Sequence, residues 1–517
     1  MVLDNGRSGI EDLPIEIQLQ ILDYLKFDSR CIASEVCRLW NSLAFSGRFM
    51  NRICLRLEMT EANAKEIVAT LNASVRNYRH IAVDFNDQPV AMMDHLANAI
   101  GENDALERLT LRGMNRVEPV QLLILLDSVP HLKRLYLIGT KEELLYETNF
   151  QARMIESSSQ NPPWTSALST DSPVKLQSLE KLHLLTSGKV SYSSKFFIRK
   201  FPNITQLYLS SQQPCNAALL SDYKNQLETL SLSTPSNLFV VAFCSISFPK
   251  LRNLYLDQME LHDQLVVAQC MNFFKNRVHA GRLQQLILHP KFMMRTAIFS
   301  TICDNCGALQ VLKLSLDYMD GDALKDVTNL QQLQNLSLYG TAYFRESPHW
   351  PYQIGTLRTV QISASRFPIS LLEFIADIAP NLENLKMEDV ENPEELFRIL
   401  PGLLEKIRLL ELSYSKQFER PPSCHPSGLL RSMHTMESFH LQRVIIKHGI
   451  QGWLQDAPQL KEVALTDCST LTDTHLVILT TNCPKLDRLK LTRCSNVTVN
   501  GIEEFHSRVP LCRIDVN

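Results

Sequence analysis

The sequence predicts an α/β protein: a solenoid with a curved parallel β-sheet and outer helices, preceded by a small all-α segment. Three observations lead to this fold class. An apolar pattern, L-x-x-L-x-L, recurs along most of the chain, proline precedes many of its copies at the same offset, and residues 12–45 follow a helical period outside the repeat. The chain has 517 residues, which suits several domains or one repeat array rather than a single compact core.

The repeat predicts one strand and one helix per turn over residues 78–517. A typical copy is Leu106/Leu109/Leu111, and weaker copies stand at both ends of the series. Most copies follow one another at intervals of about 23 to 29 residues, the period of a leucine-rich repeat. Each turn of such an array buries its spaced apolar side chains against its neighbours, so the pattern specifies a continuous stacked core.

Proline marks the start of many predicted strands. It stands two residues before the first apolar position at Pro130, Pro202, Pro249, Pro380, Pro458 and Pro484. A proline there cannot continue the preceding helix and favours an extended backbone. The segments between strands, such as VQLLILLDS before Pro130, are expected to be helices.

Three segments fall outside the regular repeat. Residues 1–9 are expected to be a disordered N-terminus, and residues 51–77 a helical linker or N-terminal cap. An insertion loop is expected at about 140–175, which contains SSSQNPPWTSALSTDSP. This loop is either flexible without a role or a flap for regulation or substrate contact.

Residues 10–50 are expected to form a separate helical module. Asp12 and Pro14 mark a helix start, and Ile17, Ile21 and Leu25 recur at helical spacing. A second apolar stripe follows at Ile32, Val36, Leu39, Trp40 and Leu43. From the pattern alone, this module is either a plain helical cap that covers the end of the solenoid or a docking domain.

The runs LPIEIQLQILDYL and VCRLW resemble an F-box. The matching positions are Leu13, Pro14, Ile17, Ile21, Leu22, Tyr24, Leu25, Val36, Cys37, Arg38 and Trp40. With the repeats that follow, the chain resembles the F-box/leucine-rich-repeat family, the substrate receptors of Skp–cullin–F-box (SCF) ubiquitin ligases. The closing segment from Leu465 to Ile502 is similar to the cysteine-containing repeats of that class.

The resemblance implies a receptor that binds a Skp-type adaptor, and through it the cullin and RING subunits. It implies that the adaptor contacts Leu13, Pro14, Ile17, Ile21, Leu22, Leu25, Val36, Cys37 and Trp40. Arg30 and Glu35 stand where the family often carries apolar residues. This leaves an alternative open, a non-ligase repeat scaffold with a degenerate F-box.

The polar face of the predicted sheet is the candidate surface for a protein substrate. Side chains between the second and third apolar positions, and those at the outward positions that precede them, point to this concave side. Candidate substrate-binding residues are Arg134, Tyr136, Lys181, His183, Tyr208 and Tyr255. Tyrosine and arginine are frequent in interface hot spots. The alternative is a solvated face of mixed polarity.

Composition argues against several function classes. The formal net charge of −3 supplies no basic excess for nucleic acid, and the most apolar stretch, from Leu238 to Phe248, is too short for a membrane span. With no signal-peptide pattern and no dense cysteine framework, we expect a cytoplasmic or nuclear protein. Neither nucleic acid nor a membrane is expected as a partner.

No catalytic motif, cofactor site or metal site is expected. Nucleotide-binding, hydrolase and kinase signatures do not occur in the sequence. Cys303 and Cys306 form a lone CxxC without a second pair of ligands, so we interpret them as buried structural thiols rather than zinc ligands. The chain is therefore expected to be a non-catalytic receptor, with an enzyme built on an unrecognised site as a weaker alternative.

Overall fold

The chain divides into two compact units, Met1–Asp222 and Tyr223–Asn517. The computed structural model describes residues 10, 13–51, 53–74, 76–86, 93–114, 119–140, 176–186, 201–210, 217–233, 237–257, 263–277, 281–289, 291–292, 294–340, 352–363, 369–388, 406–414, 423–424, 435–443, 445–446 and 457–516. The predicted N-terminal segment 1–9 and the insertion at about 140–175 lie outside these residues, apart from Thr140.

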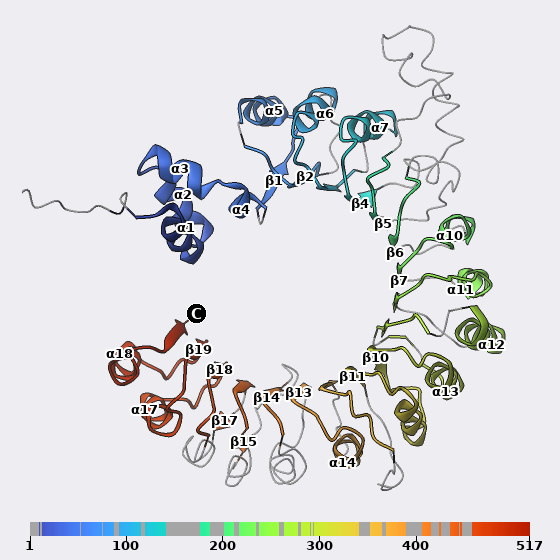
Figure 1. The fold of residues 1–517 in the computed structure, drawn as a ribbon, viewed down its shortest axis with the longest axis vertical. Coiled ribbons are helices and arrows are strands. Elements are labelled where there is room, and N and C mark those ends of the chain that lie inside the picture. The colour runs from blue at the N-terminus through green and yellow to red at the C-terminus, as the bar shows by residue number, and fades with distance from the viewer. Residues whose placement is uncertain are drawn as a thin grey trace, which may run out of the picture. The chain divides into compact units, whose positions relative to one another are not determined.

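The first unit begins with a helical module. Its helices are α1 (Ile15–Tyr24), α2 (Phe27–Ser34), α3 (Arg38–Ala44) and the short α4 (Gly47–Met50), drawn in dark blue in Figure 1. Pro14 lies immediately before α1 with φ −49° and ψ 144°, so the backbone is still extended there and turns helical at the next residue. These four helices fall within residues 10–50, for which the sequence predicts a helical module.

The rest of the first unit is a parallel sheet. Its strands are β1 (Cys54–Glu58), β2 (His80–Asp84), β3 (Arg108–Arg112), β4 (Arg134–Thr140), β5 (Lys181–Thr186) and β6 (Gln206–Ser210), each paired with the next along the chain. Helices α5 (Ala64–Ala73), α6 (Met93–Gly101) and α7 (Pro119–Asp127) cover one face of this sheet, and α10 (Ala217–Tyr223) crosses the boundary between the units (Figure 1).

Residues 51–77 differ from the expected helical linker. They contain strand β1 as well as helix α5, and β1 pairs in full register with β2, from Cys54 against His80 to Glu58 against Asp84. In this copy Arg52 stands where other copies have their first apolar residue, which hides the repeat in the sequence. Pairing with β2 satisfies the backbone of β1 on one side, so the solenoid begins one turn earlier than predicted.

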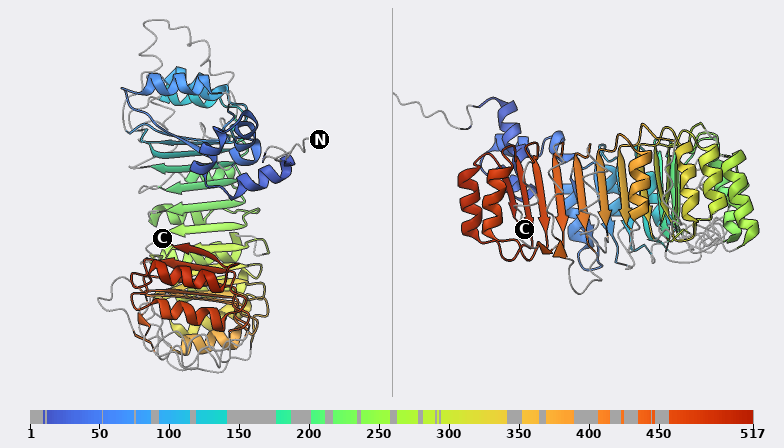
Figure 2. Two further views of the ribbon diagram at one scale, coloured as in Figure 1. Left: turned by 90° about the vertical axis from the view of Figure 1, so that its left-hand side faces the viewer. Right: turned by 90° about the horizontal axis from the view of Figure 1, so that it is seen from below.

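The second unit repeats the same strand-and-helix turn. Its sheet strands are β7 (Thr229–Ser233), β8 (Asn253–Asp257), β9 (Gln285–Leu288), β10 (Val311–Ser315), β11 (Asn335–Tyr339), β12 (Thr359–Ser363), β13 (Asn384–Glu388), β14 (Leu409–Ser413), β16 (Ser438–Gln442), β18 (Glu462–Thr466), β19 (Arg488–Thr492) and β20 (Arg513–Val516). Consecutive members of this series pair in parallel. Figure 2 shows these strands lying side by side.

Helices connect these strands on the outer side of the sheet. They are α11 (Asn237–Cys244), α12 (Gln264–Asn272) with a π-helical continuation η3 (Phe273–Arg277), α13 (Thr296–Asn305), the 3₁₀ helix η4 (Gly321–Asn329), α14 (Ile369–Ile378), α17 (Asp473–Asn482) and α18 (Val499–Arg508). Two short strands, β15 (Ser423–Cys424) and β17 (Ile445–Ile446), pair separately. No described helix combines the length and the apolar character that a membrane span requires.

The periodic apolar residues form the core of both units. Leu109 on β3, Leu286 on β9 and Leu489 on β19 are fully buried, as are nearly all their equivalents. Polar positions alternate with them along each strand and lie on the opposite face. The predicted α/β solenoid, with a parallel sheet and outer helices behind a small all-α module, is confirmed.

Candidate functional site

The helical module closes a small apolar core of its own. Leu22, Ala33, Ala44 and Phe49 form the buried centre. Leu19, Leu25, Trp40, Leu43 and Phe45 pack against that centre. This core is complete within the module. The apolar side chains that remain outside it are therefore not needed for the module to fold.

Gln18 ties the first and third helices together. Its side chain is 1% exposed, and its Oε1 accepts a hydrogen bond of 2.9 Å from Nε1 of Trp40. Its Nε2 donates to the carbonyl oxygen of Leu13 at 2.8 Å, just before α1. Cys37 is the N-cap of α3, where its sulfur accepts from the backbone N–H of Trp40. These bonds orient both the indole and the Leu13–Pro14 segment.

The outside of the module carries many exposed apolar side chains. Tyr24 is 89% exposed, Ile32 68% and Val36 67%. Others on α1 to α3 and the segment before them are Ile10, Leu13, Ile15, Ile17, Phe27 and Leu39. Exposed apolar groups at this density on a small domain are typical of a protein-binding surface.

The structure places the predicted adaptor-binding residues in three environments. Leu13, Pro14, Ile17 and Val36 are exposed. Ile21, Leu25, Cys37 and Trp40 are half-buried. Leu22 is fully buried at the centre of the core, so we assign it to packing rather than to direct contact with a partner. The helical period alone places Leu22 beside the outer stripe, and only the packing of α1 on α2 and α3 shows which side it faces.

Sequence reasoning missed several residues of this surface. Ile15 and Phe27 are exposed apolar residues that were not among the predicted adaptor contacts, and buried Gln18 links α1 to α3 through its hydrogen bond with Trp40. A glutamine between apolar positions of a helix was the available signal for Gln18.

Arg30, which departs from the family pattern, is turned inward. Its guanidinium lies 4.2 Å from the ring centroid of Phe49 and donates to the carbonyl oxygen of Leu25, which follows the last residue of α1. This charge therefore satisfies a helix end and covers the core rather than interrupting the exposed apolar surface. Glu35, the second departure, is exposed.

The polar face of the sheet in the first unit is the second candidate site. Parallel pairing places Arg108, Arg134 and Lys181 side by side on β3, β4 and β5. Two residues further along the strands, Tyr136, His183 and Tyr208 form a second row on β4, β5 and β6. We call these six residues the cationic–aromatic face. It includes five of the six residues predicted for substrate binding.

The second row is a ladder of aromatic rings. The ring centroids of Tyr136 and His183 are 5.5 Å apart, and those of His183 and Tyr208 are 5.4 Å apart. Lys181 lies against this ladder, with its Nζ 4.3 Å from the centroid of Tyr208 and 5.7 Å from that of Tyr136. Such cation–π contacts hold the lysine over the rings without neutralising its charge.

The cations of this face have no acidic partner in the described part of the chain. The nearby carboxylate of Glu107 pairs instead with Lys133, at 3.0 Å, and with Arg79, at 3.8 Å. Burial, with a contribution from Lys181, lowers the pKa of His183 below its usual value. His183 is therefore neutral at pH 7, and the net positive charge comes from Arg108, Arg134 and Lys181.

His80 continues the first row on β2. It stands in register with Arg108, and its Nε2 lies 3.2 Å from Oγ1 of Thr110. Burial and the charges of Arg108, Arg56 and Arg112 lower its pKa to about 4. A cavity of about 190 Å³ opens here, lined by Asn51, Ile53, Arg79, His80, Glu107, Arg108 and Arg134.

Tyr255, the sixth predicted substrate-binding residue, belongs to the second unit. It lies on the polar side of β8, and its hydroxyl is 3.1 Å from Oε1 of Gln285. The polar face of this unit pairs several of its cations with carboxylates. Lys386 binds Glu411 at 2.7 Å, and Arg488 binds Asp515 at 2.9 Å.

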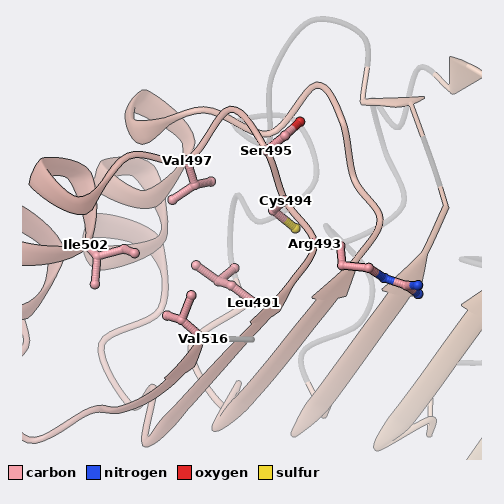
Figure 3. A pocket seen from close by; sticks show the side chains of 7 residues that line it. All are labelled: Leu491, Arg493, Cys494, Ser495, Val497, Ile502 and Val516. Atoms are coloured by element: carbon pink, nitrogen blue, oxygen red, sulfur yellow. The ribbon is translucent and has the colours of Figure 1, made fainter.

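A cavity of about 310 Å³ lies in the last turns of the second unit, lined by Leu491, Arg493, Cys494, Ser495, Val497, Ile502 and Val516 (Figure 3). The sulfur of Cys494 is half-buried there, and a hydrogen bond from the thiol of Cys468 lowers the pKa of Cys494 to about 7. Arg493 at its rim is paired with Asp467 at 2.7 Å.

Cys303 and Cys306 are buried, and burial raises the pKa of Cys306 to about 12 and that of Cys303 well above its usual value. Both thiols therefore stay protonated at neutral pH. Among the described residues, no group of three His, Cys, Asp or Glu side chains is arranged to hold a metal ion.

Residues 10–56 match the F-box-like family. These residues contain α1 to α4 of the helical module, which we now call the F-box-like module. No curated protein matches the chain.

Solved structures resemble the chain at low sequence identity. One is the crystal structure of the Rad7 and Elc1 complex in yeast, with 12% identity, a TM-score of 0.32, and coverage of 96% of this chain and 94% of that chain. Another is the TLR13–ssRNA13 complex, with 14% identity, a TM-score of 0.43, and coverage of 92% and 75%. At these TM-scores the resemblances assign neither function nor partner to this chain.

Proposed function

We propose that this chain is the substrate-recognition subunit of an SCF-type ubiquitin ligase. The F-box-like module binds a Skp-type adaptor, the adaptor joins the cullin and RING subunits, and the solenoid binds the protein to be ubiquitylated. The observation that carries the proposal is the F-box-like match over residues 10–56, on a module whose exposed apolar side chains lie outside its closed core.

Docking in this proposal uses the exposed apolar side chains of the module. The adaptor contacts Leu13, Pro14, Ile17 and Val36. The side chain of Gln18 holds Leu13 in place by donating a hydrogen bond to the backbone carbonyl oxygen of Leu13. A stable protein interface of standard size covers about 800 Å² on each partner. Leu22 contributes indirectly, because its packing positions α1 against α2 and α3.

The proposed work of the chain is positioning rather than chemistry. A receptor that holds its client and the ligase machinery together raises the effective concentration of a client lysine near the charged conjugating enzyme. No group of this chain then has to take part in bond formation.

A repeat scaffold without ligase activity is the alternative, and exposed Glu35 is the observation that favours it. A carboxylate beside an apolar contact surface has to be desolvated on docking, which weakens binding unless the adaptor supplies a partner. Arg30 no longer supports this alternative, because it is turned toward Phe49.

The test compares the intact chain with a Leu13→Ala/Pro14→Ala variant in binding to a purified Skp-type adaptor. The matched control is Val499→Ala/Leu511→Ala, which removes exposed apolar carbons from the second unit. We expect the first variant to lose at least about tenfold in affinity and the control to bind like the intact chain. Equal recovery of the adaptor with all three proteins would contradict the F-box assignment.

Reconstitution separates the ligase from the scaffold. The chain is assembled with adaptor, cullin and RING subunits, and ubiquitin transfer to proteins captured on the solenoid is measured. Transfer that depends on Leu13 and Pro14 supports the receptor. Firm adaptor binding without any transfer to captured proteins supports the scaffold.

A further inference from the structure

The cationic–aromatic face concentrates positive charge on adjacent strands. Parallel pairing aligns Arg108, Arg134 and Lys181 across β3 to β5, and neighbouring strands are about 4.8 Å apart. Like charges directly opposite one another on a sheet destabilise it. Within the described residues no carboxylate forms an ion pair with these three side chains, although the pKa of Glu107, which is lowered by its hydrogen bond and ion pair with Lys133, is also lowered by the charge of Arg134.

Among the described residues, three adjacent cations without a carboxylate partner stand together on β3 to β5, whereas Lys313 and Lys490 are single unpaired cations on the polar face of the second unit. On the same face of the second unit, Lys386, Arg488 and Arg513 each have a carboxylate partner. In the first unit, Glu107 lies next to Arg108 in sequence, yet it pairs with Arg79 and Lys133. The repeat can therefore pair such cations, whereas those of β3 to β5 form no ion pair with any residue that the structure describes.

The aromatic side chains next to the cations are held in fixed positions. Tyr136, His183 and Tyr208 are half-buried and in ring contact with one another, so little side-chain entropy remains to be lost when a ligand covers them. Lys181 already rests over two of the rings. A ligand for this face must combine negative charge with groups that pack on aromatic rings.

We propose that the cationic–aromatic face binds an extended acidic peptide segment of the client protein, whose carboxylates pair with Arg108, Arg134 and Lys181 and whose intervening side chains pack on Tyr136, His183 and Tyr208. The idea that this segment belongs to a client rests on the proposed function, whereas the site itself does not. Alternate side chains of an extended peptide are about 6.7 Å apart, so two successive carboxylates reach neighbouring cations.

Charge favours a peptide over nucleic acid. The three cations of this face occupy three adjacent strands, and Arg56 on β1 and Arg112 on β3 add positive charge near His80. The acidic residues Glu58 and Asp84, however, lie on the polar face of β1 and β2. The whole chain has a net charge of −3. A nucleic-acid groove needs a run of positive charge along the phosphate backbone, and the carboxylates of Glu58 and Asp84 interrupt such a run here.

The test measures binding of a fluorescent peptide of alternating Glu and Tyr to the intact chain, with and without a Skp-type adaptor. A peptide of the same length with Gln in place of Glu, and a single-stranded oligouridine of similar length, serve as comparisons. The variants are Arg134→Gln/Lys181→Gln and the matched control Lys313→Gln/Lys490→Gln, which removes the same charge from the polar face of the second unit.

We expect the Glu peptide to bind at least about tenfold more tightly than the Gln peptide, and the first variant to remove most of that difference. The control variant should change affinity by less than about twofold, and added salt should weaken binding. Equal binding of the two peptides, equal loss in both variants, or tighter binding of oligouridine that Arg134→Gln/Lys181→Gln abolishes would each overturn the proposal.

Adaptor binding is scored in the same samples. Arg134 and Lys181 lie on the sheet, whereas the proposed adaptor surface lies on α1 to α3, so the first variant should keep the adaptor and lose the peptide. Loss of adaptor binding by the intact chain with the peptide still bound would count against the proposed function and leave the acidic-peptide site standing.

Discussion

The indole of Trp40 donates a 2.9 Å hydrogen bond to the side-chain oxygen of Gln18 across the F-box-like module. The two residues are 22 positions apart in sequence and lie on α3 and α1. Because the same glutamine also binds the carbonyl oxygen of Leu13, one buried amide links the terminal tryptophan of the motif to its opening Leu-Pro pair.

Replacement of Gln18 by leucine should loosen the module. The indole N–H of Trp40 and the carbonyl oxygen of Leu13 would both lose their partner in a region shielded from water, at a cost of about 1–3 kcal/mol for a buried polar group. We expect amide hydrogen exchange in α1 and α3 to become at least about tenfold faster. The control is Gln20→Leu, an exposed position on the same helix, and faster exchange there too would contradict this role for Gln18.

Leu22→Ala and Ile17→Ala should separate packing from docking. Leu22 is fully buried, so its truncation leaves a cavity and should destabilise the module by about 2–5 kcal/mol. Ile17 is exposed, so its truncation should change stability by less than about 0.5 kcal/mol while it weakens adaptor binding. Hydrogen exchange and adaptor affinity are measured on both variants. If Leu22→Ala left the module stable but weakened adaptor binding, Leu22 would be a contact residue rather than a packing residue.

Cys494 should be alkylated faster than Cys306 at neutral pH. The hydrogen bond from Cys468 lowers the pKa of Cys494 to about 7, so the reactive thiolate fraction rises with pH and is half-maximal near that value. Burial raises the pKa of Cys306 to about 12, and its alkylation should be negligible over the same range. The rate of iodoacetamide labelling of each cysteine peptide between pH 5 and pH 9 is measured by mass spectrometry.

Cys468→Ala supplies the control for the cause of this shift. Without the donated hydrogen bond, the labelling midpoint of Cys494 should move upward toward about 8.5, the value of an unperturbed thiol. An unchanged midpoint in Cys468→Ala would show that the thiol of Cys468 does not lower the pKa of Cys494, because the backbone hydrogen bond of residue 468 remains in that variant.

Much of the fold follows from the sequence because each turn of the solenoid is a local unit. The two-residue alternation of Leu109 and Leu111 specifies a half-buried strand, and the prolines before the strands mark where the preceding helices end. The sequence pattern did not predict the first strand, β1. In the β1 copy Arg52 replaces the leading apolar residue, and only pairing with β2 shows that residues 54–58 are a strand.

The sequence by itself determined the repeat, the helical module and the residue types of both candidate sites. Tertiary structure alone decided that Leu22 faces inward while Ile17 faces outward, that Gln18 bonds Trp40, and that Arg30 turns toward Phe49. It also set Arg134 beside Lys181, which lie 47 residues apart, because parallel pairing aligns strands whatever the length of chain between them. Local periodicity encodes which residues are apolar, whereas the direction and partner of each polar side chain depend on neighbours that are distant in sequence.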